Sequence, residues 1–161
     1  MSRDLDRIDQ RILQELEVNG RLPIVELAQR INLTNTPCSE RVKRLERSGY
    51  IRRYKAVLDA ERLGLGHLTV VQVSLAATGD HSLPTFNREV GKIDEIESCL
   101  MIAGSFDYNL TVRTRDIAHF RDVLGEKINK LPGVHQTHSY AVMEVVKTER
   151  DYSPLDRVAK A

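Results

Sequence analysis

The sequence predicts an α+β protein in which three short helices come first and a β-α-β-β-α-β unit follows. Two observations support this prediction. Apolar residues recur at helical spacing through the first third of the chain, and from His67 onward β-branched apolar runs alternate with helical stretches. With 161 residues, the chain has the size of one ordinary domain or two small ones. We expect two domains, at residues 1–62 and 63–147, and a tail at 148–161.

The composition indicates a globular protein and excludes several classes. Hydrophobic residues make up 41% of the chain and charged residues 29%, as in folded domains. No apolar run approaches the roughly 18 residues of a membrane-spanning helix, and the acidic N-terminus lacks the apolar core of a signal peptide. Only two cysteines are present, Cys38 and Cys99, so we expect reduced thiols in a cytoplasmic protein.

The first two helices follow from their apolar stripes and their ends. One helical face of residues 5–19 carries Leu5, Ile8, Ile12 and Leu16. Asp6 is the expected N-cap of this helix, and Gly20 follows its last turn. A second helix is expected at 24–31, where Pro23 occupies the position that a better capping residue would take.

A cationic third helix is expected after a short turn at 32–34, with Thr36 as N-cap and Gly49 just past its end. Its buried stripe is Cys38, Val42 and Leu45. Its polar face is Thr36, Glu40, Lys43, Arg44 and Arg47, flanked by Ser39 and Arg41. We expect Glu40 to pair with Arg44 within the helix. The basic, β-rich segment 50–58 that follows suggests a strand or wing.

Three short helices, a tight turn and a cationic third helix describe a helix-turn-helix. The whole chain has a net charge of only +1, but Thr34–Lys55 holds seven Lys and Arg against two Glu, a net charge of +5. Residues 63–161 hold 11 Lys and Arg against 13 Asp and Glu, a net charge of −2. Small polar groups early in such a helix reach base edges, and the later cations neutralise phosphates. The alternative is an ordinary solvated helix face.

The second half of the chain reads as alternating strands and helices. Strands are expected at 67–75, 97–103, 107–114 and 134–146, and helices at 82–93 and 117–128. Asp116 is the expected cap of the last helix, whose inward residues are Ile117, Phe120, Leu124 and Ile128. This order is the split-βαβ or ferredoxin-like arrangement. An RNA-binding module is disfavoured, because the strand at 67–75 has no aromatic residue on which a base would stack.

One corner of this unit has the groups that a small zwitterion needs. The loop 104–108 brings together a glycine, a carboxylate and a phenol, and Thr137, Ser139 and Ala141 share one face of the last strand. Asp107, Gly104 and Ser139 would supply the polar contacts. The alternative is a turn whose Asp107 caps its own backbone.

The remaining patterns disfavour an enzyme. His135 and His138 point to opposite faces of a strand, so we expect no metal site. The sequence has no phosphate-binding glycine loop and no nucleophile pair. We therefore expect no catalytic residue and no cofactor.

Several stretches resemble the Lrp/AsnC (leucine-responsive/asparagine, feast/famine) family of transcriptional regulators along almost the whole chain. They are LDRIDQRILQEL, TNTPCSERVKRLERSGYI, AGSFDYNLTVR and KLPGVHQTHSYAVMEVVK. The resemblance implies a winged helix-turn-helix that binds pseudo-palindromic promoter DNA, and a ferredoxin-like (RAM, ACT-like) sandwich that dimerises and assembles into octamers. It implies an amino-acid effector bound between subunits, and action at the nucleoid in the cytoplasm.

The resemblance also implies which residues bind. For DNA they are Thr34, Asn35, Thr36, Ser39, Glu40, Arg41, Lys43, Arg44 and Arg47. For the effector they are Met101, Ala103, Gly104, Asp107, Tyr108, Ile117, Thr137, Ser139, Tyr140, Ala141 and Val142. Ser105 and Asn109 depart from the family pattern, so leucine is not assumed to be the effector. The alternative function is an amino-acid-binding regulatory subunit that acts through protein–protein contacts.

Overall fold

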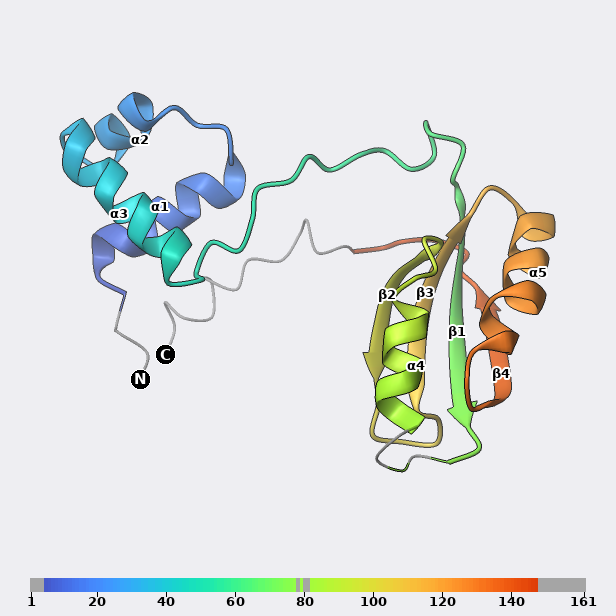
Figure 1. The fold of residues 1–161 in the computed structure, drawn as a ribbon. Helices are drawn as coiled ribbons and strands as arrows, with labels where there is room; N and C mark the ends of the chain where they lie inside the picture. Colours follow the sequence, from blue (N-terminus) through green and yellow to red (C-terminus); the bar gives the residue numbers. More distant parts are fainter. Residues whose placement is uncertain (1–4, 78, 80–81, 148–161) are drawn as a thin grey trace. The chain divides into compact units, whose positions relative to one another are not determined.

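The structure, a computed structural model, describes residues 5–77, 79 and 82–147. The chain forms two compact units, and the second of them is Leu58–Val145. The first unit is built from α-helices, and the second is built around a sheet with helices beside it (Figure 1). The predicted tail at 148–161 lies outside the described residues.

The helical unit contains α1 (Arg7–Val18), α2 (Ile24–Arg30) and α3 (Asn35–Arg47). The predicted N-cap of α1 is confirmed, because Asp6 Oδ1 accepts a hydrogen bond from Asp9 N–H at 2.7 Å. Apolar side chains of all three helices form one core: Ile12, Leu16, Leu22, Leu27, Ala28, Ile31, Cys38, Val42 and Leu45. Cys38 is fully buried in that core, as its position in the apolar stripe predicts.

The start of α3 differs from the prediction. The helix begins at Asn35 and its N-cap is Thr34, so the N-cap prediction for Thr36 is wrong. Pro37 therefore occupies the third helical position rather than the first. The missing N–H of Pro37 costs the helix no hydrogen bond, because the first four N–H groups of a helix have no acceptor within it. The first such bond in α3 runs from Cys38 N–H to Thr34 O, at 3.2 Å.

The strand predicted after α3 is not formed within the chain. Gly49 ends the helix with a φ of +80°, as expected, but residues 52–59 are neither helix nor strand. The chain instead returns to its own helices: the Tyr54 ring lies against Gly20, and its hydroxyl donates to Glu46 Oε1 at 3.1 Å. A β-rich composition does not make a strand unless a neighbouring strand supplies hydrogen-bond partners.

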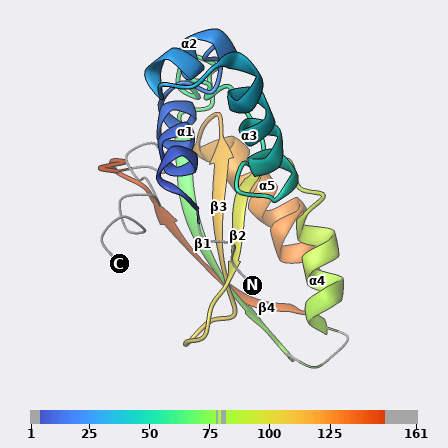
Figure 2. The same cartoon turned by 90° about the vertical axis from the view of Figure 1, so that its left-hand side faces the viewer.

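The second unit is a four-stranded antiparallel sheet covered on one face. Its strands are β1 (His67–Leu75), β2 (Ile96–Met101), β3 (Tyr108–Thr114) and β4 (Val134–Ala141), in the order β2-β3-β1-β4. Both helices, α4 (Ser82–Val90) and α5 (Ile117–Glu126), lie on the same face, as the two views show (Figures 1 and 2). A short 3-10 turn, η1 (Ile128–Lys130), follows α5. The predicted ferredoxin-like arrangement is confirmed.

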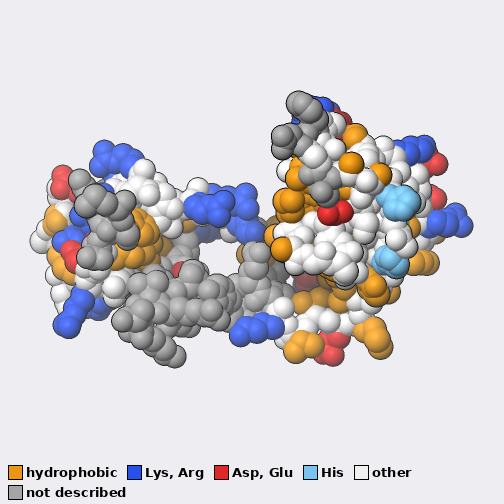
Figure 3. Space-filling view, turned by 90° about the horizontal axis from the view of Figure 1, so that it is seen from below, with side chains coloured by type: hydrophobic (Ala, Val, Ile, Leu, Met, Phe, Trp, Pro, Cys, Tyr) orange, Lys and Arg blue, Asp and Glu red, His pale blue; other side chains and the backbone are white. Residues whose placement is uncertain are grey.

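The core lies between the sheet and these helices. Alternate residues of the central strands face it: Val71, Val73 and Leu75 of β1, and Tyr108, Leu110 and Val112 of β3. The Tyr108 ring packs on Phe86 of α4 with centroids 4.3 Å apart. Residues of opposite parity, such as Val70 and Tyr140, lie on the other face of the sheet. Large hydrophobic side chains remain exposed at the surface (Figure 3).

Several predictions for this unit are wrong in detail. The helix expected at 82–93 ends at Val90, and the strand expected at 97–103 is Ile96–Met101. The last strand ends at Ala141 rather than at residue 146. It runs antiparallel to β1, which begins at His67, and the hydrogen bond from Val142 N–H to the Leu68 carbonyl is where this pairing ends. Ile117, predicted to face inward, is 65% exposed in the first turn of α5. The Asp116 cap is confirmed by its hydrogen bond from His119 N–H at 2.7 Å. No helix in the described ranges is long and apolar enough to cross a membrane.

Candidate nucleic-acid interface and effector site

The outer face of α3 carries the polar side chains that helical spacing places there. Thr34, Asn35, Thr36, Glu40, Lys43, Arg44 and Arg47 are exposed, while Ser39 and Arg41 are half-buried. Neither Lys43 nor Arg47 forms an ion pair with any residue that the structure describes. Arg47 Nε donates only to the Lys43 carbonyl one turn earlier, at 3.3 Å. These two cations are therefore available to an anionic partner.

Arg41 and Arg44 are engaged differently, by two carboxylates of the first helix. We call Asp6, Asp9, Arg41 and Arg44 the Asp–Arg cluster. One nitrogen of Arg41 donates to Asp6 Oδ2 at 2.6 Å and to Asp9 Oδ1 at 2.9 Å. One nitrogen of Arg44 lies 2.5 Å from each carboxylate oxygen of Asp9. The predicted pairing of Arg44 with Glu40 is thus replaced by a contact with another helix.

Within the Asp–Arg cluster, the contact between Asp6 and Arg41 favours the charged form of both groups. Asp9 is only 3% exposed, and a carboxylate at such a site requires hydrogen-bonded cations. Burial acts to raise the pKa of Asp6, but the Asp9 N–H and the Arg41 guanidinium outweigh it and lower that pKa. The same carboxylates, through their hydrogen bonds, raise the pKa of Arg41. The cluster therefore ties α3 to the start of α1.

The loop between β2 and β3 is fastened to the end of β1 by Asp107. Asp107 Oδ2 accepts from Leu75 N–H at 2.7 Å, and Asp107 N–H donates to the Val73 carbonyl at 2.9 Å. The sequence left two roles open for Asp107, a contact with a ligand or a cap on the backbone of its own turn. The structure shows a backbone cap, but the carboxylate caps the end of β1 and not its own turn. A Cβ at Gly104 would meet only Ile102 Cγ2, at 3.6 Å. The chain itself therefore does not require glycine at position 104.

The residues expected to bind the effector do not form one group within the chain. Met101, Ala103, Gly104, Asp107 and Tyr108 lie at one end of the sheet, where Tyr108 is buried in the core. Ala141 lies nearer the other end, in the row where Thr69 pairs with both Val112 and Ala141, while Val142 is one residue further along and Ile117 follows the end of β3. Four steps along β3, at about 3.3 Å each, separate the row of Tyr108 from the row of Val112 and Ala141 by about 13 Å.

The expected residues of β4 are further divided between the faces of the sheet. Thr137, Ser139 and Ala141 pair with Val73, Val71 and Thr69, and so belong to the helix-covered side. Thr137 Oγ1 donates to Asn129 Oδ1 at 3.1 Å. Tyr140 lies on the opposite face, beside Val70. A single small ligand therefore cannot touch all of these side chains in one chain.

Family models match both units of the chain. Residues 5–52 match a winged helix-turn-helix DNA-binding model, and residues 68–152 match the Lrp/AsnC ligand binding domain, which is more than half of the chain. The chain belongs to the Lrp/AsnC family. This confirms the resemblance on which the functional expectations rest.

Similar proteins of the Lrp/AsnC family are transcriptional regulators. The proline dehydrogenase transcriptional activator of Rhizobium radiobacter is 47% identical over 144 residues, which are 89% of this chain and 92% of that protein. The leucine-responsive regulatory protein of Escherichia coli K12 is 45% identical over 145 residues, 90% of this chain and 88% of that protein. A Neisseria meningitidis transcriptional regulator solved as its L-Met complex has a TM-score of 0.88 at 34% identity, covering 96% of this chain and 99% of that one. The chain is therefore an Lrp-type DNA-binding transcriptional regulator with an amino-acid ligand-binding domain, and not an enzyme.

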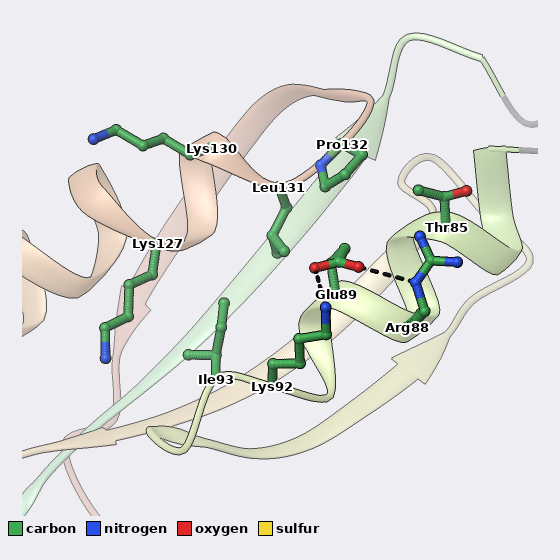
Figure 4. A pocket seen from close by; sticks show the side chains of 9 residues that line it. All are labelled: Thr85, Arg88, Glu89, Lys92, Ile93, Lys127, Lys130, Leu131 and Pro132. Atoms are coloured by element: carbon green, nitrogen blue, oxygen red, sulfur yellow. Dashed lines mark hydrogen bonds and ion pairs between the residues drawn. The ribbon is translucent and has the colours of Figure 1, made fainter.

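One cleft in the ligand-binding domain of this Lrp/AsnC protein has none of the expected effector residues in its lining. It has a volume of about 480 Å³ and is lined from α4 and residues 127–132 (Figure 4). Its cations are held by neighbouring carboxylates: Glu89 accepts from Arg88 at 2.9 Å and from Lys92 at 2.7 Å. Lys127 donates to Glu95 at 2.6 Å. These internal pairs leave little unbalanced charge in the cleft to attract an anion.

The ion pairs of Asp6 and Asp9 were missed by sequence reasoning, although Asp6 was recognised as the cap of the first helix. Both carboxylates contact arginines more than thirty residues further along the chain, the Asp9–Arg44 separation being 35 residues. Local spacing carries no signal for such a pair. The usable signal was the helical spacing of Asp9 itself, since it lies three and seven residues before the buried Ile12 and Leu16, and a carboxylate on that face requires partners.

Proposed function

We propose that this protein is an amino-acid-responsive regulator that binds pseudo-palindromic promoter sites as an oligomer of dimers. The observation that carries the proposal is the exposed face of α3, where Lys43 and Arg47, which form no ion pair among the described residues, follow the small polar side chains of Thr34, Asn35 and Thr36. Small groups at the start of a recognition helix suit base edges, and cations in its later turns suit phosphates. Because its partner is promoter DNA, the protein acts at the nucleoid in the cytoplasm.

DNA binding is tested with a duplex from the protein's own promoter region. We expect affinity to fall steeply with salt, with a slope of about −0.9 for each phosphate contact. Arg47→Ala is expected to weaken binding to all sequences and to lessen that slope by about 1, whereas Ser39→Ala is expected to change base preference. Arg121→Ala, at an exposed arginine of α5, is the matched control. A wild-type protein with no salt-sensitive binding would refute the proposal.

We further propose that the effector site is completed by a second subunit. In support, Asp107 and Tyr108 lie at one end of the sheet, in line with Thr137, whereas Ala141 and Val142 lie toward the other end, so two copies would each contribute part of the site. The open face of the sheet carries hydrophobic side chains suited to such an assembly, including Leu100 at 57% and Tyr140 at 52% exposure. Dimers arranged in this way would present two recognition helices to half-sites about 34 Å apart.

The effector is proposed to be an amino acid. The relatives point to apolar ones, since their names and ligands include leucine, proline metabolism and L-Met. A thermal-shift panel of common amino acids identifies it, because a ligand that binds only the folded state raises stability by about 2.7 kcal/mol at a hundred times its Kd. If no amino acid changes stability, assembly size or DNA affinity, the sensing part is refuted. Amino-acid binding without DNA affinity would instead favour a regulatory subunit.

A further inference from the structure

We infer that a row of uncharged polar side chains on the open face of the sheet makes this protein pair with a second copy of itself in preference to other chains of the same fold. The row consists of Gln72 of β1, Asn109 of β3 and His138 of β4, and we call it the polar row. The inference rests on the proposed assembly of two subunits and deepens it, because it names the side chains that select the partner.

The strands of the sheet carry very little charge, although 29% of the residues of the whole chain are charged. In these four fully described strands, the Lys, Arg, Asp and Glu residues are Glu97 and Arg113, which form an ion pair with each other. Depletion of charged residues marks the core of a protein–protein interface. The open face is therefore suited to burial against another protein surface that is itself uncharged.

The polar row crosses the middle of this open face. The strand register aligns Gln72 with Asn109 on one side and with His138 on the other, and Leu100 of β2 continues the row beyond Asn109. The neighbouring row on the same face is Ser98, Thr111, Val70 and Tyr140. These two rows run through all four strands, so a partner that covers the centre of the face must cover the polar row.

A second copy of the chain is the partner that can satisfy the polar row. The amides of Gln72 and Asn109 and the neutral imidazole of His138 each contain both a hydrogen-bond donor and an acceptor. A two-fold axis through the row brings the row against its own copy, so that donors meet acceptors. An apolar surface in the same place would leave the amides buried without partners, and this cost disfavours such a chain.

A variant with an apolar row stands for a chain that lacks these polar groups. In Gln72→Leu combined with Asn109→Leu, both amides are replaced by apolar groups, and two such chains pair without an unsatisfied amide. Because the removal of both partners of a polar contact is nearly neutral, we expect this variant to associate with itself as the wild type does. Circular dichroism and light scattering check that the variant folds and associates.

The matched control is Ser98→Ala combined with Thr111→Val, on the same face of the sheet. Ser98 Oγ donates to Thr111 Oγ1 at 2.9 Å, so these hydroxyls already satisfy each other within one chain. Their removal leaves no unsatisfied group in a mixed dimer. The control variant is therefore expected to mix with the wild type at random.

The experiment mixes two full-length chains, one of them isotopically labelled, and reads the composition of the dimers by native mass spectrometry after exchange. Labelled and unlabelled wild type are expected to mix at random. Wild type and the apolar-row variant are expected to form mixed dimers at least about tenfold below random, because a buried amide without a partner costs about tenfold in an equilibrium constant.

A second pair of variants, Asn109→Asp and Asn109→Lys, leaves the core untouched because Asn109 lies outside it. If the rows of two copies meet, these oppositely charged chains form mixed dimers above random. The inference is overturned if the apolar-row variant mixes with the wild type at random or no longer associates with itself, if the control variant is excluded as strongly, or if opposite charges do not favour mixing. A wild type that stays monomeric would instead refute the proposed assembly itself, and the inference with it.

Discussion

Substitution of Asp107 separates two roles of one carboxylate. Its Oδ2 accepts from Leu75 N–H at 2.7 Å, so Asp107→Ala leaves a nearly buried N–H without that acceptor. A hydrogen bond to a charged group contributes about 1.5–3 kcal/mol, and we expect this variant to lose about 2 kcal/mol of unfolding free energy. In Asp107→Asn an amide oxygen still accepts the bond, and the expected loss is about 1 kcal/mol or less.

The effector response then distinguishes the roles of this side chain. In a domain of this size, a change of 1 kcal/mol shifts the Tm by about 4–8 °C. We expect Asp107→Asn to keep a Tm near that of the wild type but to lose the stabilisation by the effector amino acid, because a neutral amide does not pair with its ammonium group. Asp107→Ala is expected to lose both.

The assay is thermal unfolding with and without the amino acid that stabilises the wild type. Asp122→Asn, at an exposed acid of α5, makes the same charge change as a control. If Asp107→Asn is stabilised by the effector as strongly as the wild type is, the carboxylate only closes the strand. If Asp107→Ala unfolds like the wild type, the bond to Leu75 contributes nothing and the calculation is refuted.

Three further predictions concern stability. Leu110→Ala, at a fully buried site, is expected to cost about 2–5 kcal/mol in urea unfolding, and a cost no greater than that of exposed Leu63→Ala would contradict the packing. Burial and the hydrogen bond to Glu46 raise the pKa of Tyr54 to about 12. The protonated hydroxyl therefore stabilises the fold fully below the ordinary phenol pKa, and this stabilisation is lost as pH rises through about 12. In an ultraviolet titration, Tyr54→Phe should lack the tyrosine ionisation near pH 12 that the wild type shows. The hydrogen bond from Lys127 lowers the pKa of Glu95 despite burial. The Glu95 carboxylate therefore stabilises the fold above the usual carboxyl pKa, and this stabilisation is lost as pH falls through the lowered pKa. The stability of Glu95→Gln should depend less on acid pH than that of the wild type, and an unchanged pH dependence would refute this.

The elements that could be predicted are those whose structure depends mainly on their own local sequence. The strand at 67–75 was predicted residue for residue, because β-branched apolar residues continue through a strand whose alternate residues are buried. The caps at Asp6 and Asp116 were also predictable, since an N-cap bond is local. The expected strands at 50–58 and 142–146 failed for the opposite reason. Their composition favours strands, but no neighbouring strand is within reach to complete the hydrogen bonds.

The same distinction applies to the candidate sites. Helical spacing correctly predicted that Lys43 and Arg47 are exposed, because the face of a helix on which a residue lies depends only on its position in the sequence. It did not reveal that Arg41 and Arg44 are bound by Asp9, a contact made by tertiary packing. Nor did spacing reveal that Gly104 and Val142 lie near opposite ends of the sheet, which follows from the strand register.

The separation of the effector residues along the sheet has a consequence for how the protein reads amino-acid levels. If two chains complete the site, as proposed above, the ligand binds only to the associated state, so ligand affinity and subunit affinity are linked. The amino-acid concentration that half-saturates the regulator then falls as the regulator becomes more abundant. The cell's own expression of this protein would thereby set the nutrient threshold at which its promoters respond.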